Sequence, residues 1–281
     1  MDSPSLPSPL PTQRSISAPP DIASYAELLS LRATLSSAKI IALDFEGVDH
    51  GIPFPNILSE VGLTILDLST LDLNPDLDIK EVVRQTQSFH FIIDTWAHIT
   101  PATCPARHHF TGKRHTAKPY ESRVARSSIV TREYAAHRIR EIVCGATQGC
   151  GEPGQVIVVC WDAGFETRQL DGLGLPLTTL GSMQWDLQAW ELIRRRWCGR
   201  RQVAACRFFA SLGLTHLDFL HNASNDTWTE IVSFVRLLTL GYEDWCRWTT
   251  GEDIPLGHVL DFPGSYFEYN QALDVYSAVQ W

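Results

Sequence analysis

Three short apolar runs lie close together in the first hundred residues, and their order constrains the fold more than any other feature. They span residues 39–44, 60–67 and 87–94, and each has the length of a buried β-strand. The 44–60 connection contains glycines and prolines typical of a loop or wide turn, so the three strands could form an antiparallel meander. A fourth run, Gln155–Cys160, follows a helical stretch and is the most strand-like segment of the chain. This succession predicts an α/β fold with a mixed sheet.

Helical spacing of apolar residues marks most of the segments around these runs. Helices are predicted for Asp21–Ser37, Thr131–Cys144, Gly164–Gly172, Arg200–Leu212 and Asn225–Leu240. Gly181–Asp186 is predicted to be a fifth strand. We therefore expect a mixed five-stranded sheet flanked by helices.

Composition divides the chain into a central domain and two flanking segments. Residues 1–22 are predicted to be a disordered tail, because the first twenty contain six prolines and five serines. The domain is expected to span residues 23–248, with a basic insertion near 104–128 where periodicity fails. Residues 249–281 form a C-terminal extension whose structure the pattern does not predict.

Several absences narrow the class of protein. No run approaches the roughly 18 apolar residues that span a bilayer, and the N-terminus lacks the features of a secretory signal. The seven cysteines form no C-x-x-C pair, so we expect free thiols in a reducing compartment rather than disulfides or a zinc ribbon. These observations predict an intracellular protein, in the cytoplasm, the nucleus or both, with no membrane partner.

The net charge of −9 conceals two basic segments. Residues 104–140 hold nine Lys and Arg against two acids, and residues 194–207 hold six arginines and no acid. A local basic patch can attract a polyanion even on an acidic protein. Two solvated basic faces would explain these charges equally well.

Asp44 and Glu46 end the first apolar run and give the first chemical signal. Residues i and i+2 of a strand point to the same face, so both carboxylates project together. They stand at the carboxyl end of a strand, where α/β proteins place ligand sites, and like charges this close favour a divalent cation. Taken alone, the pair is better explained as ordinary acids that end a strand and face water.

Two further clusters of polar residues are each weak evidence for a functional site when considered alone. Residues 221–226 (HNASND) precede a predicted helix, and an Asn or Asp there could simply cap it. Residues 161–166 (WDAGFE) follow the fourth strand. Asp162 and Glu166 lie four apart, so they share a face if a helix begins early.

The order of the three clusters resembles that of the DEDD exonucleases, which have D-x-E on the first strand, a mid-chain carboxylate and a final H-x4-D. The histidine spacing is similar to that of the subgroup that includes ribonuclease T and proofreading domains. The chain most resembles a fungal RNase H-like family with a His-Asn-Ala-Gly-Asn-Asp signature, which includes exonuclease-like proteins linked to RNA silencing and mRNA export. The resemblance extends from about residue 39 to 240, includes Ser59–Gly62, and has Ser224 where glycine is usual.

The middle motif departs from this pattern. The subgroup has His-Asn-Ala-x-Phe-Asp, whereas this chain has Trp161 in place of the histidine and Glu166 in place of the final aspartate. Glutamate keeps the charge but adds a methylene. Magnesium demands near-ideal octahedral geometry, so manganese or calcium would tolerate this change better.

The resemblance implies an RNase H-like fold and a 3′–5′ exonuclease that acts on single-stranded RNA or DNA, with RNA favoured. Asp44, Glu46, Glu166 and Asp226 would hold two Mg²⁺ or Mn²⁺ ions. His221 would act as the general base that activates water.

Substrate contacts are predicted on the same basis. Phe45 or Phe165 would stack on the terminal base, Asn222 and Asn225 would contact the substrate, and the basic segments would follow the phosphate backbone. The alternative is a catalytically impaired RNase H-like module that binds RNA or a protein. The change at Glu166 and the Pro/Ser-rich tail, a candidate contact for a protein partner, both allow it.

Overall fold

A six-stranded mixed sheet and eight α-helices make up the part of the chain that the computed structural model describes, which comprises residues 19–48, 57–97, 122–148, 156–175, 183–198, 203–214, 220–255 and 270. The strands are β1 (Lys39–Val48), β2 (Ile57–Asp67), β3 (Gln87–Ile93), β4 (Ser127–Val130), β5 (Val156–Cys160) and β6 (Met183–Asp186). The helices are α1 (Tyr25–Leu35), α2 (Ile79–Gln85), α3 (Arg132–Gln148), α4 (Ala163–Gly172), α5 (Glu191–Arg196), α6 (Ala205–Ser211), α7 (Ala223–Leu238) and α8 (Tyr242–Thr249), with 3-10 turns η1 (Leu68–Thr70) and η2 (Asp94–Trp96).

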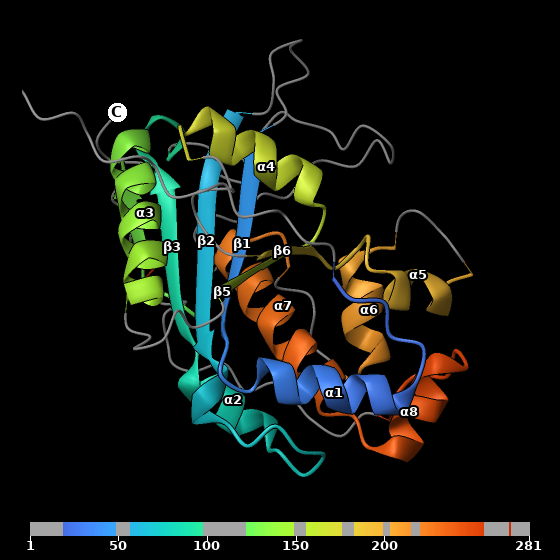
Figure 1. Ribbon diagram of the computed structural model, residues 1–281. Helices are drawn as coiled ribbons and strands as arrows, with labels where there is room; N and C mark the ends of the chain where they lie inside the picture. Colours follow the sequence, from blue (N-terminus) through green and yellow to red (C-terminus); the bar gives the residue numbers. More distant parts are fainter. Residues whose placement is uncertain are drawn as a thin grey trace, which may run out of the picture.

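The strands lie in the order β4-β3-β2-β1-β5-β6 (Figure 1). β1 pairs antiparallel with β2, and β2 with β3, which confirms the predicted meander. β5 is parallel to β1 and β6 to β5, because α3 and α4 return the chain before each of these strands. The carboxyl ends of β1, β5 and β6 therefore meet at one end of the sheet.

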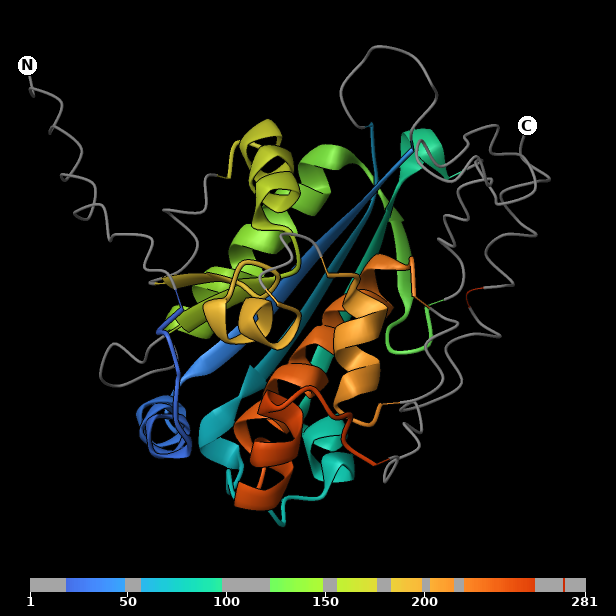
Figure 2. The same cartoon turned by 90° about the vertical axis from the view of Figure 1, so that its right-hand side faces the viewer.

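Alternation along β1 decides which side chains meet which helices. Figure 2 shows α3 and α4 on one side of the sheet and α7 on the other. The core under α3 and α4 takes the odd-numbered apolar residues of β1, namely Ile41, Leu43 and Phe45. The core under α7 takes the even-numbered ones, Ile40 and Ala42. Because strands have a period of two, Asp44 and Glu46 continue the face that α7 covers.

The first turn of α7 rests directly on β2. A Cβ atom at Gly62 would lie only 2.1 Å from the carbonyl oxygen of Ala223, so glycine is needed for this close approach. One turn further along, the hydroxyls of Thr64 and Thr227 are 2.9 Å apart. This contact fixes the start of α7 over the acidic end of β1.

The prediction of five strands missed β4, which lies at the sheet edge and pairs with β3. Residues 104–128 are predicted to be an insertion because hydrophobic periodicity fails there, yet Ser122, Val124, Ala125 and Ser127 are buried. Ser127 is buried because its hydroxyl lies 2.7 Å from Nδ1 of His90. Residues 122–128 therefore belong to the folded domain, and residues 98–121 lie outside the described part.

Residues next to both predicted boundaries of the domain, 23 and 248, pack against its core. The carbonyl of Pro20 accepts a hydrogen bond from Nε1 of Trp190 at 2.8 Å, and Ile22 is buried, so residues 20–22 pack on the domain. After α7, α8 buries Trp248 in the same core, and Ile254, beyond the predicted end at residue 248, is buried there as well. The rest of the predicted tail and most of the C-terminal extension lie outside the described residues. None of the described helices is long and apolar enough to cross a membrane.

Candidate metal centre

Three acidic side chains converge where β1 passes under the first turn of α7. Carboxylate oxygens of Asp44, Glu46 and Asp226 all lie within 4.8 Å of one another. The first two occupy same-face positions of β1, and Asp226 is the fourth residue of α7. All three side chains are half-buried. Oxygen donors gathered in this way are the ligands that hard divalent cations prefer.

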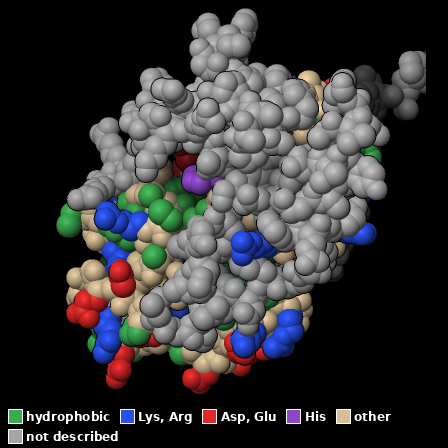
Figure 3. Space-filling model, turned by 180° about the vertical axis from the view of Figure 1, so that it is seen from behind, with side chains coloured by type: hydrophobic (Ala, Val, Ile, Leu, Met, Phe, Trp, Pro, Cys, Tyr) green, Lys and Arg blue, Asp and Glu red, His purple; other side chains and the backbone are tan. Residues whose placement is uncertain are grey.

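The residues before α7 hold Asp226 in place. Oδ1 of Asn222 accepts a hydrogen bond from the backbone N–H of Asn225 at 3.3 Å and so caps the helix. His221 has a φ of 70°, in the left-handed region, and its backbone N–H donates to Oδ2 of Asp226 at 3.1 Å. His221 is exposed. Seen from the α7 side, a histidine side chain borders a recessed acidic side chain (Figure 3).

The three acids are poised to bind a cation, because their charges are buried close together. Burial, as the main cause, and the charge of Glu60, as the second, raise the pKa of Asp44 to about 7. The pKa values of Glu46 and Asp226 lie well above their usual values, mainly because of burial and next because of the charge of Asp44. Among the described residues, Oδ2 of Asp44 and Oδ1 of Asp226 have no hydrogen-bond partner. Unpaired buried charge is costly, so this set of oxygens fits a divalent cation.

Glu166 is near this group but is not a member of it. It lies in the first turn of α4, is only 3% exposed, and its Oε2 has no hydrogen-bond partner among the described residues. Burial raises its pKa well above the usual value, and the charge of Asp44 is the next cause. The structure thus gathers three of the four predicted ligands and places the fourth beside them. Asp162 is exposed and, with a φ of 69°, precedes α4 in the left-handed conformation.

Two buried acids near the group were missed in the sequence. Glu60 lies opposite Glu46 in the register of β1 and β2. Its Oε2 accepts a hydrogen bond from Nδ2 of Asn222 at 3.2 Å and lies 3.1 Å from Nε2 of His90. The second, Glu230, follows Asp226 by one turn of α7. Spacing by one helical turn could have indicated Glu230, whereas the burial of Glu60 depends on packing under α7.

Three of the four residues that were predicted to contact the substrate are buried, so the prediction is corrected for them. Phe45 is 3% exposed and lies in the core under α3 and α4. Asn222 and Asn225 are fully buried, and Oδ1 of Asn225 accepts a hydrogen bond from the backbone N–H of Arg123 at 2.9 Å. Their side chains support the start of α7 instead. Phe165 on α4 is half-buried and remains a candidate for stacking on a base.

Arginines of the second basic segment take part in structural contacts. The guanidinium of Arg196 lies 5.0 Å from the ring centroids of both Trp197 and Trp248, and it bonds Asp253 at 2.5 Å. Its two preceding neighbours each pair with a carboxylate, that of Glu191 for Arg194 and that of Asp21 for Arg195. This part of the segment therefore tethers the two ends of the described domain, and its role in following phosphates stays a prediction.

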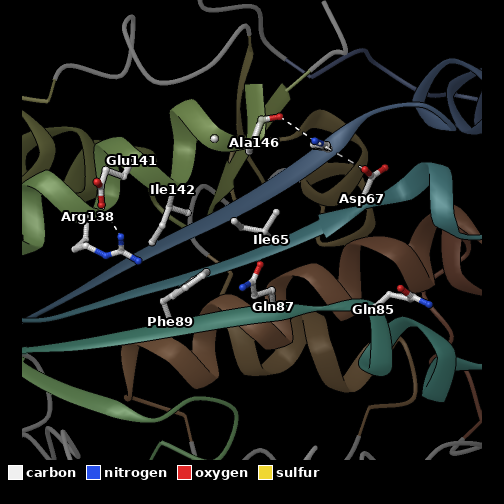
Figure 4. A pocket seen from close by; sticks show the side chains of 11 residues that line it. Ile65, Asp67, Gln85, Gln87, Phe89, Arg138, Glu141, Ile142 and Ala146 are labelled. Atoms are coloured by element: carbon white, nitrogen blue, oxygen red, sulfur yellow. Dashed lines mark hydrogen bonds and ion pairs between the residues drawn. The ribbon is translucent and has the colours of Figure 1, made fainter. Parts of the chain in front are cut away.

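A pocket of about 460 Å³ lies away from the acids, against the beginning of β1, the end of β2 and α3 (Figure 4). Its charged side chains already have partners: Nζ of Lys39 bonds the carbonyl of Ala146 and lies 4.0 Å from Asp67, and Arg138 pairs with Glu141. The acids stand toward the other end of β1. The metal-binding geometry is thus separate from this pocket.

The strand and the helix that carry the three acids lie within a region that matches a known protein family. Residues 39–237, from the start of β1 to the end of α7, match the DEDDh family model described as DNA polymerase III subunit epsilon-like, C-terminal domain. No curated protein sequence matches the chain significantly.

Two yeast structures are similar to the chain. One is of the RNase domain of the Pop2 protein, with a TM-score of 0.34 and 14% identity over 83% of this chain and 89% of that chain. The other is of the NOT1 MIF4G domain co-crystallized with CAF1, with a TM-score of 0.41 and 11% identity over 82% and 90%. On the family match, which covers most of the chain and all the converging acids, this protein belongs to the DEDDh, DNA polymerase III epsilon-like family and has an RNase H-like fold.

Proposed function

We propose that this protein is a divalent-metal-dependent nuclease that shortens single-stranded nucleic acid, with RNA favoured, from the 3′ end. The convergence of Asp44, Glu46 and Asp226 in a member of the DEDDh family carries the proposal. The 3′–5′ direction, the preference for RNA and the closer relation to the fungal His-Asn-Ala-Gly-Asn-Asp group come from the sequence resemblance. A protein partner bound through residues 1–22 stays a prediction.

In this proposal Asp44, Glu46 and Asp226 hold the metal, and Glu166 completes the set. Two bound Mg²⁺ or Mn²⁺ ions would stabilise the attacking and leaving oxygens of the phosphodiester. His221 accepts the proton of the attacking water, a role that suits histidine near neutral pH. Its backbone N–H bonds Asp226, so the residue lies next to the acids, and its side chain is exposed to water and substrate.

Phe165 would stack on the terminal base of the substrate. It lies on α4 next to Glu166 and is only half-buried, so part of its ring can be reached. Stacking on an aromatic ring is tolerant of sequence, because every base has a flat face. This fits an enzyme that removes nucleotides one after another without reading a sequence.

Purified protein and labelled single-stranded oligonucleotides of RNA and DNA test the proposal. With 5′ labels, we expect a ladder of products shortened from the 3′ end in Mn²⁺ or Mg²⁺ and none in a chelator. Asp44→Ala should abolish the ladder, and His221→Ala should slow it by about 10²–10⁴-fold. Glu191→Gln, at an exposed salt bridge on α5, is the control and should retain full activity.

Two outcomes would change the proposal. If neither metal supports shortening of either nucleic acid, the nuclease is excluded, and a gel shift with the same oligonucleotides decides whether the domain is a binding module. If shortening persists in Asp44→Ala, the activity belongs to a contaminant.

A further inference from the structure

Asn270 belongs to the C-terminal extension, yet its side chain is fully buried against the residues that lead into β4. Its Oδ1 accepts a hydrogen bond from the backbone N–H of Ser127 at 2.8 Å. Its Nδ2 donates to the carbonyls of Ser122 and Ala125 at 2.9 and 3.0 Å. One buried amide therefore holds residues 122–127 (the 122–127 segment) at three backbone positions.

The 122–127 segment also bonds the first turn of α7, through two serines. The hydroxyl of Ser122 lies 2.9 Å from the carbonyl of Ala125 and 2.7 Å from Oγ of Ser224. Asn270 already donates to that carbonyl, so the single proton of Ser122 can go to Ser224. The proton of Ser224 is then donated to Oδ1 of Asn222, 2.8 Å away. The related signature has glycine at position 224, and glycine has no hydroxyl with which to make this link.

A second route runs from the same segment to the same amide. Oγ of Ser127 lies 2.7 Å from Nδ1 of His90, and Nε2 of His90 lies 3.1 Å from Oε2 of Glu60. Nδ2 of Asn222 donates to that same Oε2 at 3.2 Å. All of these side chains are buried. Asn270 fixes the 122–127 segment at the head of both routes, so it sets the positions from which both ends of the Asn222 amide are held.

Asn222 stands between this network and the metal centre. It is the N-cap of α7, and its carbonyl accepts a hydrogen bond from the backbone N–H of Asp226 at 3.0 Å. We propose that Asn270 is a positioning residue, which orients Asn222 and through it the carboxylate of Asp226. Residues that orient metal ligands without touching the metal typically change metal affinity by about 10–100-fold. The inference deepens the proposed function and rests on it, but it concerns metal affinity and can fail by itself.

The affinity for Mn²⁺ tests this role. The full chain is freed of metal and titrated with MnCl₂, and free Mn²⁺ is measured by electron paramagnetic resonance. Asn270→Ala should raise the dissociation constant of Mn²⁺ by about tenfold, the lower end of that range, because Asn270 acts through other residues. Ser224→Ala interrupts one of the two routes and should raise the constant several-fold. In the double variant the two factors should not multiply, because part of the effect of Asn270 passes through Ser224.

Arg32→Met is the matched control. Arg32 is also a buried side chain that ties a distant segment to α7, since its guanidinium donates to the carbonyls of Leu238 and Leu240 at 2.8 and 3.1 Å. These bonds lie at the end of α7 away from Asp226 and just beyond it. The variant should unfold at a lower temperature than the unaltered chain, because two carbonyls lose their charged donor. Its dissociation constant for Mn²⁺ should stay unchanged.

Three results would overturn the inference and leave the proposed function standing. The first is an unchanged dissociation constant in Asn270→Ala, even if this variant unfolds at a lower temperature. The second is a double variant in which the two factors multiply, since the two residues would then act independently. The third, which decides if Asn270→Ala does not fold, is an unchanged constant in Ser224→Ala. An unaltered chain that binds no Mn²⁺ overturns both the inference and the proposed function.

Discussion

Among single residues, Glu166 has the most direct link to metal preference. Its carboxylate stands beside the three-acid group rather than in it, and it is one methylene longer than the aspartate of the related motif. Mg²⁺ holds its ligands in stricter geometry than Mn²⁺ does. Glu166→Asp should therefore raise the ratio of kcat/KM in Mg²⁺ to that in Mn²⁺ several-fold. Assays of both proteins in both metals measure this ratio, and an unchanged ratio would show that the methylene does not limit the site.

His221 combines a side-chain role with an unusual backbone conformation, and two variants separate them. Asn adopts the left-handed region more readily than Ala, so His221→Asn should keep the bond from its backbone N–H to Asp226 and the stability of the fold. It should still lose about 10²–10⁴-fold in kcat, because the proton acceptor is gone. An unchanged kcat in His221→Asn would assign the proton transfer to another group.

At the scale of elements, the seating of α7 on β2 controls the site. In Gly62→Ala the new Cβ would meet backbone atoms of α7, with the carbonyl oxygen of Ala223 at 2.1 Å, and backbone cannot move aside as a flexible side chain can. We expect a loss of about 1–3 kcal/mol in the free energy of unfolding, or more if the helix cannot shift. Mn²⁺ binding should weaken as well, since α7 carries Asp226.

Gly145→Ala is the control for this prediction. Gly145 lies in α3, where a Cβ would meet nothing within 4 Å. This change should stabilise the protein by about 0.5–1 kcal/mol, because alanine favours the helix. Urea unfolding and Mn²⁺ titration compare the three proteins. Equal stability of Gly62→Ala and the unaltered chain would mean that α7 can retreat without cost.

Elements with apolar alternation or continuous apolar runs could be predicted, and those held by buried polar contacts could not. β1, β2 and β5 are recognisable because both of their faces enter a core, and β3 because Phe91 and Ile93 enter the core under α3 and α4. β4 is hidden because it is four residues long and begins with Ser127, whose hydroxyl is satisfied by His90. The same limit applies to the site. Asp44 and Glu46 follow from strand spacing, whereas the burial of Glu60 arises only when α7 docks on the sheet.

At the scale of the whole molecule, the acids at the end of the sheet concentrate negative charge in a chain whose net charge is −9. A polyanionic substrate would meet repulsion there unless cations occupied the site. The arginines that might offset this charge are partly engaged, since Arg196 is held between two tryptophan rings. Metal binding is therefore expected to govern substrate binding as well as chemistry.

The same acids should couple folding to pH. Burial raises the pKa of Asp44 from 3.8 to about 7, so the folded protein holds protons that the unfolded chain releases. Metal-free protein should consequently be most stable in acid and lose stability as the pH rises through about 7. Saturating Mn²⁺ should remove most of this loss, because the cation replaces the protons, and metal affinity should rise with pH. Urea unfolding between about pH 5 and pH 8, in chelator and in Mn²⁺, measures both effects. Stability that increases with pH in chelator would show that these carboxylates are compensated without metal.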